Sequence, residues 1–156
     1  MRRWLVRLAT HGAALCLGFA LGIYALPILT APEGPDQATL QATAATALFK
    51  GRFARNLKGS DPLHWGEGEI RLTREKIAHE GRLAPGPDYR LYLAPEFVDN
   101  KQDFLRIKTQ SRQIAEVKTF NGFLLDIPRG TDIAAYTTVV IWCEAFGQFI
   151  TAAAYR

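Results

Sequence analysis

The chain has 156 residues, 48% of them hydrophobic and 22% charged, which fits one folded domain with a short additional segment. A disordered chain would lack this share of apolar residues, and two cysteines are too few for a multi-disulfide scaffold. The net charge is +4, but Arg2, Arg3 and Arg7 supply three positive charges before any acidic residue occurs. The remainder is nearly balanced and has no basic run, so we expect no nucleic-acid partner.

Residues 1–32 have the features of a single transmembrane anchor. No charged residue occurs from Leu8 to Pro32, and about 20 apolar residues in a helix cross a hydrocarbon core of about 30 Å. The three arginines precede this stretch, whereas Glu33 and Asp36 follow it. The positive-inside rule then places the N-terminus in the cytoplasm and the rest of the chain outside it. We expect a single-pass protein of a bacterial inner membrane with a periplasmic C-terminal domain.

A cleaved signal peptide is the alternative interpretation of these residues. The apolar region of a signal peptide is normally about 7–15 residues long and ends at small residues. Here the apolar stretch is longer, and the best cleavage site, after Ala31, has bulky Leu29 before it and Pro32 after it. We therefore favour an uncleaved signal-anchor. Gly18 and Gly22 have a spacing that permits helix pairing, which leaves the oligomeric state open.

Two segments follow the predicted anchor: a tether at residues 33–48 and a β domain at residues 49–156. The tether is rich in Ala, Thr, Gln, Gly and Pro, a composition that suits a flexible stalk or a short helix. In the β domain, short runs of alternating hydrophobicity are separated by Gly, Pro and Asp. These runs predict strands near residues 69–73, 77–83, 89–93, 114–119, 123–127, 138–144 and 148–154.

The spacing of these short runs predicts an all-β domain, either an antiparallel β-sandwich or a barrel. Asn121-Gly122 is typical of a hairpin turn between the two predicted strands that flank it. Residues 103–108 are ambiguous, because their apolar positions suit neither the strand period nor the helix period. Thr131 or Asp132 is placed to cap one turn of helix before the last two strands.

Cys143 is the only sulfur atom of the predicted exported domain. It ends residues 139–143, part of the most apolar run outside the anchor, which predicts a central strand. Exported proteins usually pair their cysteines or lack them, and Cys16 lies in the predicted membrane span, where it cannot reach Cys143. A leftover cysteine is a candidate reactive thiol, cofactor ligand or intermolecular partner. The alternative is that Cys143 simply packs in the core, as free cysteines often do.

Several other residues are candidates for a binding site with Cys143. His64-Trp65 precedes a glycine, which suggests a turn where the backbone passes close to another group. His64 and Cys143 could together hold an iron or copper centre, although the domain has no Met and no His shortly after Cys143, so a blue-copper loop is absent. A hydrogen-bonded structural role for His64 is the alternative. Asp88 is either functional or a cap of its own turn, and Trp142 is a candidate neighbour of the sulfur.

Three segments together resemble the DM-thirteen (electron-transfer DM) domain family: residues 64–68 (HWGEG), 86–93 (GPDYRLYL) and 139–146 (VVIWCEAF). The resemblance covers roughly residues 49–156. It implies a β-rich extracytoplasmic domain whose cysteine, Cys143 here, acts in redox chemistry as a bare thiol or by holding a prosthetic group such as haem. Animal members carry partner modules that this sequence lacks, so the resemblance also implies a separate redox partner protein.

The sequence thus predicts a membrane-anchored extracytoplasmic domain with an electron-transfer or thiol-redox role centred on Cys143. His64, Trp65, Asp88 and Trp142 are the candidate binding residues around it. The alternative is a non-catalytic β-scaffold for binding or assembly, with Cys143 as a core residue. In either case we expect an electron-transfer or binding protein more than a turnover enzyme. A sulfur that opens onto a pocket would favour the redox role, and a sulfur sealed in the core would favour the scaffold.

Overall fold

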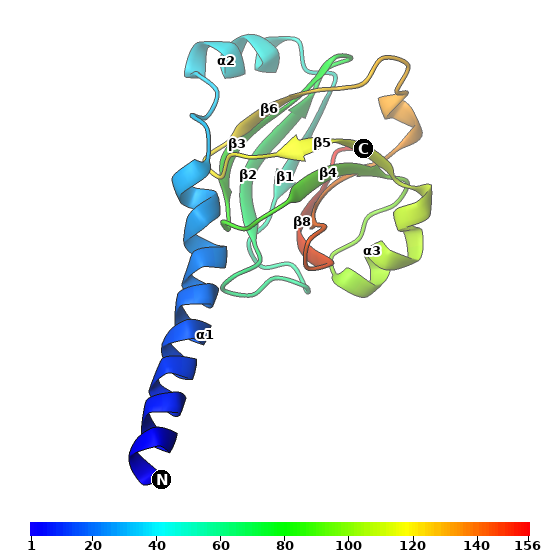
Figure 1. Cartoon of the computed structure of the whole chain (residues 1–156). Coiled ribbons are helices and arrows are strands. Elements are labelled where there is room, and N and C mark those ends of the chain that lie inside the picture. The colour runs from blue at the N-terminus through cyan, green and yellow to red at the C-terminus, as the bar shows by residue number, and fades with distance from the viewer.

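The computed structural model describes residues 1–156 and shows a long N-terminal helix beside a β domain (Figure 1). This helix, α1 (Arg2–Thr30), has 29 residues and no buried side chain. At 1.5 Å per residue it is about 43 Å long, so it is long and apolar enough to cross a membrane. The β domain lies beside the C-terminal half of α1, and the N-terminal half projects away from it (Figure 1).

A short helix, α2 (Gln37–Ala45), lies within the segment predicted as a tether and packs against the domain. Asp36 caps its N-terminus, because the Asp36 carboxylate accepts a hydrogen bond from the Thr39 backbone N–H at 2.9 Å. Leu40 and Thr43 are its buried residues. Of the two forms expected for this segment, the structure therefore has the short helix.

The β domain consists of two antiparallel sheets of four strands each, which confirms the predicted sandwich. The first sheet has the order β1-β2-β3-β6, with the bounds β1 (Phe49–Phe53), β2 (Gly66–Leu72), β3 (Lys76–Leu83) and β6 (Phe123–Asp126). The second has the order β5-β4-β7-β8, with the bounds β5 (Arg112–Val117), β4 (Tyr89–Ala94), β7 (Thr138–Cys143) and β8 (Gln148–Ala154).

The hairpin predicted at Asn121-Gly122 is wrong, because β5 and β6 belong to different sheets. β5 pairs with β4, whereas β6 pairs with β3. Gly122 does adopt a left-handed conformation, with φ of 108°. That conformation turns the chain from one sheet to the other. The turn was therefore predicted correctly, but the pairing of the strands on either side of it was not. The residues of a turn do not determine whether the flanking strands pair with each other or join different sheets.

The ambiguous residues 103–108 lie mostly in a helix, α3 (Lys101–Ile107), followed by a single 3₁₀ turn, η1 (Lys108–Gln110). The Asn100 side chain caps α3 by accepting a hydrogen bond from the Asp103 N–H at 3.0 Å. A second 3₁₀ turn, η2 (Ile133–Ala135), is capped by Asp132, one of the two residues expected in that role.

Strand β7 divides its side chains between two hydrophobic cores. Val139, Ile141 and Cys143 belong to the large core between the two sheets. Val140 and Trp142 belong to a smaller core on the other side of the second sheet, where α3 packs. All six residues of β7 are buried, as expected for a central strand. Cys143 and Trp142 are therefore neighbours in the chain that face opposite sides of the sheet.

Candidate functional site

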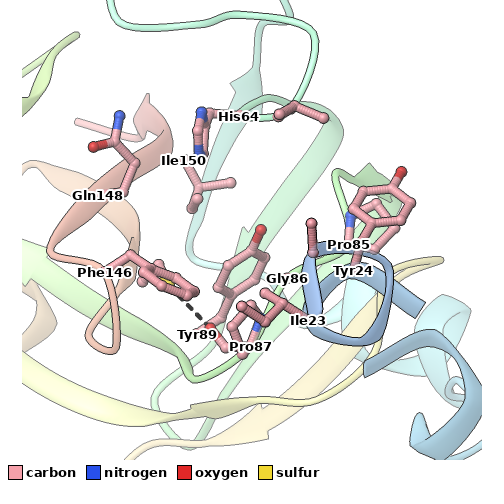
Figure 2. A pocket seen from close by; sticks show the side chains of 13 residues that line it. Ile23, Tyr24, His64, Pro85, Gly86, Pro87, Tyr89, Phe146, Gln148 and Ile150 are labelled. Carbon is pink, nitrogen blue, oxygen red and sulfur yellow. Dashed lines mark hydrogen bonds between the residues drawn. The ribbon is translucent and has the colours of Figure 1, made fainter. Parts of the chain in front are cut away.

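A cleft of about 290 Å³ lies between α1 and one end of the β sandwich (Figure 2). Helix α1 contributes one wall, made of Ala20, Ile23 and Tyr24. The β domain contributes the rest, from the loop before β2, the turn before β4, the strands β4, β7 and β8, and the turn between β7 and β8. These residues are Leu63, His64, Pro85, Gly86, Pro87, Tyr89, Cys143, Phe146, Gln148 and Ile150.

Cys143 is on the wall of this cleft, with only 3% of its surface exposed. Its thiol donates a hydrogen bond to the Pro87 carbonyl oxygen, with an Sγ to O distance of 3.0 Å (Figure 2). Burial raises the pKa of Cys143 above its ordinary value, and the negative charge of Asp88 adds to this effect. The sulfur is therefore a neutral thiol at neutral pH, because a thiolate requires the opposite surroundings.

The turn before β4 places the carbonyl group that receives this hydrogen bond. Asp88 follows Pro87 with φ of 53°, the one non-glycine residue with a positive φ in the protein. Its carbonyl oxygen accepts a hydrogen bond from the Glu144 backbone N–H at 3.0 Å, and its carboxylate pairs with Arg90 at 2.6 Å. These contacts fix the turn against the end of β7. Asp88 thus acts on the sulfur through the turn and does not line the cleft.

Tyr89 and Gly86 also line the cleft. The Tyr89 hydroxyl donates to the Ala84 carbonyl oxygen at 3.0 Å, so its ring folds back over the turn. A Cβ atom at Gly86 would lie 2.4 Å from the Tyr89 hydroxyl oxygen, which explains why glycine is needed at this position. The sequence did not single out either residue for the cleft, because their contact depends on how the turn packs.

His64 lies in the loop between β1 and β2, and Asp61 holds its ring in place. The Asp61 carboxylate accepts hydrogen bonds from the backbone N–H groups of Leu63 and His64, at 2.7 and 2.9 Å. Its other oxygen lies 2.7 Å from His64 Nδ1. Burial alone would raise the pKa of Asp61, but the hydrogen bonds from His64 and Leu63 outweigh it and lower this pKa. Because Nδ1 is engaged by Asp61, Nε2 is the ring nitrogen left for another partner.

The structure places His64 and Cys143 in one cleft, but it does not place the two tryptophans there. The Trp65 ring lies under the Arg55 guanidinium, 3.6 Å from its carbon atom to the ring centroid. The Trp142 ring packs on Phe104 of α3, with 5.1 Å between their centroids, on the far side of the sheet. Both rings therefore have structural partners of their own.

A polar cluster that sequence reasoning missed lies next to Trp142, outside the cleft. Lys108 Nζ lies 2.7 Å from a Glu144 carboxylate oxygen and 5.3 Å from the Trp142 ring centroid. The Tyr92 hydroxyl donates a hydrogen bond to the same carboxylate. Burial would raise the pKa of Glu144, but its hydrogen bonds from Lys108 and Tyr92 outweigh burial and lower it. Glu144 thus faces away from the sulfur, as its position next to Cys143 on a strand predicts.

The residues of the cleft do not fit a metal ion or haem. The protein has no group of three or more His, Cys, Asp or Glu side chains that could hold a metal. A haem bound through Cys143 requires a thiolate, whereas the buried thiol has a raised pKa and donates its proton to Pro87. The cleft volume of about 290 Å³ is also near the lower limit of about 300 Å³ for sites of drug-sized ligands, and haem is larger than most of these.

The fold and site define an antiparallel β-sandwich whose single cysteine lies on the wall of a small apolar cleft. The family model described as Electron transfer DM13 matches residues 52–155, more than half of the chain. The chain therefore belongs to the Electron transfer DM13 family, which confirms the resemblance seen in its motifs and associates the domain with electron transfer. No curated protein and no solved structure matches the sequence.

Proposed function

We propose that the chain is a membrane-anchored electron-transfer protein in which Cys143 is the redox-active group. In this proposal α1 is a retained anchor, the N-terminus is cytoplasmic, and the β domain lies outside the cytoplasm at the membrane surface. A second protein or a small molecule exchanges electrons with the thiol. The observation that carries the proposal is the position of Cys143 on the wall of the cleft.

The charges that flank α1 support the anchor and its orientation. Arg2, Arg3 and Arg7 lie at its N-terminal end, and α1 has no basic residue in its last turn. Cationic residues concentrate on the cytoplasmic side of membrane helices. The apolar stretch of α1 is also longer than the about 7–15 residues of a signal-peptide core, which supports retention of the helix.

The thiol chemistry follows from Cys143 being the only cysteine of the β domain. Because the β domain has no second cysteine, Cys143 cannot form a disulfide within it. Oxidation therefore occurs by exchange with a disulfide of another molecule: the Cys143 sulfur bonds to one sulfur of that disulfide, its S–S bond breaks, and the other sulfur leaves as a thiol that takes the Cys143 proton. The Pro87 carbonyl group accepts the Cys143 hydrogen bond in the reduced form and loses this donor in the oxidised form. The reduced form is thus favoured by a contact that the disulfide form lacks.

One observation favours a non-catalytic scaffold instead. Cys143 is 3% exposed, and its sulfur already has a hydrogen-bond partner in the fold. A cysteine that only packs would show the same burial, and replacing it with a residue of similar size would leave function unchanged. The two functions differ in whether the folded protein lets a reagent reach the sulfur.

This difference can be measured with the full-length protein in lipid nanodiscs. Cys16→Ala leaves Cys143 as the only thiol, and the protein is equilibrated with mixtures of 2-mercaptoethanol and its disulfide. We expect the folded protein to form a mixed disulfide at Cys143, detected as a mass increase that Cys143→Ser lacks. The proposal fails if the sulfur reacts only after the protein is unfolded in denaturant, because the thiol would then be a sealed core residue.

A further inference from the structure

We propose that the cleft beside Cys143 binds the ring of a lipid-soluble quinone that enters from the bilayer. This inference rests on the proposed retention of α1 as a membrane anchor, and it names the ligand class of the same site. It does not require Cys143 itself to exchange electrons with the ring. Three features carry it: the depth of the cleft along α1, the apolar residues at its mouth, and the kind of polar groups inside it.

The first feature is that α1 forms part of the cleft wall at membrane depth. Arg7 is the last charged residue of the helix. About 20 residues are needed to cross the hydrocarbon core, and counted from Leu8 they reach Pro27. The wall residues Ala20, Ile23 and Tyr24 lie within this stretch. A helix that spans the bilayer in this way holds the cleft at the outer leaflet, where dissolved lipids can reach it.

The second feature is the exposed apolar surface of the β domain next to α1. Leu63 and Phe146 line the cleft, yet each leaves 57% of its surface exposed. Large apolar side chains that stay exposed beside a predicted membrane helix are favourable in contact with lipid and unfavourable in water. They come from separate parts of the chain, the loop before β2 and the turn after β7. The position of these two side chains indicates that the ligand enters the cleft from the membrane.

The third feature is the lack of charged side chains in the cleft, which favours a quinone over a phospholipid headgroup as the ligand. No residue that lines the cleft is Lys, Arg, Asp or Glu. A headgroup phosphate in this cleft would be an unpaired buried charge, which is strongly unfavourable. The lining instead combines apolar walls with a few neutral or weakly basic polar groups, including His64, Gln148 and Tyr24. A quinone ring matches this lining, because it is flat and apolar and carries carbonyl oxygens that accept hydrogen bonds.

His64 is the polar group best prepared to recognise such an oxygen. Its Nδ1 atom lies 2.7 Å from the Asp61 carboxylate, which fixes the ring and leaves Nε2 available. In the protonated ring, Nε2 donates a hydrogen bond to a quinone carbonyl oxygen, and in the neutral ring it accepts one from a quinol hydroxyl group. Figure 2 shows His64 beside Ile150 and Gln148, across the cleft from Pro85 and Tyr24. Both redox forms of the ligand can therefore bind in the same place.

The test measures binding of decylubiquinone, a benzoquinone with a ten-carbon tail, to the full-length protein in nanodiscs, with empty nanodiscs as the baseline. Ala20→Trp fills the cleft from the α1 side without touching the sandwich core, and we expect it to weaken binding at least tenfold. Ala14→Trp makes the same change one to two turns away, outside the cleft, and we expect no effect. His64→Phe removes the Nε2 atom that accepts a hydrogen bond from a quinol hydroxyl group, and it is expected to weaken binding of the reduced form, decylubiquinol, several-fold.

The inference is overturned if the wild-type protein binds no more quinone than empty nanodiscs, or if Ala14→Trp weakens binding as much as Ala20→Trp. Cys143→Ser separates it from the proposed thiol chemistry, because we expect this variant to bind the quinone normally. Mixed-disulfide formation without quinone binding would leave the proposed function standing alone. An intact mass that shows loss of α1 from the mature protein would overturn both the anchor and the quinone site.

Discussion

Acid should destabilise the protein through one buried side chain, His79 of β3. This residue is fully buried, and its ring lies between Phe53 and Phe123, with centroid distances of 5.1 and 4.9 Å. Its Nε2 atom lies 3.0 Å from the Glu67 carbonyl oxygen, and Nδ1 has no hydrogen-bond partner. Burial lowers the pKa of His79 from 6.5 to about 4, against smaller opposing effects of the Glu67 hydrogen bond and the Glu80 charge.

The size of the effect follows from the two pKa values. Between pH 6.5 and about 4 the unfolded chain binds a proton at His79 that the folded protein does not bind. The free energy of unfolding therefore falls as the pH falls through 6.5, and the loss is complete near pH 4. At about 1.36 kcal/mol for each pH unit, the total loss is about 3 kcal/mol. Above pH 6.5 the neutral ring imposes no such loss.

The assay compares urea unfolding of the full-length protein and His79→Gln in detergent, at several pH values from 7.5 to 4.5. Other titrating groups contribute equally to both proteins, so the difference between the two curves isolates His79. We expect His79→Gln to be less stable at pH 7.5, because its amide fits the aromatic surroundings poorly, and to lose less stability on acidification. Parallel curves over this range would refute the reasoning, since His79 would then titrate alike in the folded and unfolded chain.

Two further changes, measured by urea unfolding, test the turn beside the sulfur and the polar cluster next to Trp142. Gly86→Ala places a Cβ atom 2.4 Å from the Tyr89 hydroxyl oxygen, and the buried ring cannot move away, so we expect a loss of about 1–3 kcal/mol. A variant as stable as the wild type would mean that Tyr89 repacks freely. Tyr92→Phe removes a hydrogen bond to the Glu144 carboxylate, and we expect a loss of about 1.5–3 kcal/mol. No loss would mean that Lys108 alone satisfies this carboxylate.

The strands were predictable where the pattern of side chains is local. The apolar run that ends at Cys143 predicted a central strand, and β7 is fully buried within its sheet. Alternation predicted β3 to within one residue at its start. Asn121-Gly122 misled the prediction, because a turn signal reports the backbone conformation and not which strands pair across it. Residues 103–108 became helical because Phe104 and Ile107 bury against the second sheet, a contact that only the folded protein supplies.

Two residues of the candidate site could be predicted from their residue type, but the residues that surround them could not. A lone cysteine and a His-Trp pair before a glycine are visible in a sequence, and both Cys143 and His64 line the cleft. The roles of Asp61 and Tyr89 were not visible, because each depends on a turn that folds back on itself. The contribution of α1 to the cleft wall could not be predicted either, because the sequence of an apolar helix does not indicate which part of a neighbouring domain it contacts.

Helix α1 encloses the cleft beside Cys143, and in the proposed function it also anchors the domain to the membrane. Trimming the N-terminus to obtain a water-soluble fragment would therefore remove Ala20, Ile23 and Tyr24 and leave the sulfur side of the cleft open to solvent. Thiol reactivity or ligand affinity measured on such a fragment would describe a different environment from that of the intact chain. For this protein, purification with α1 in place is therefore part of preserving the site.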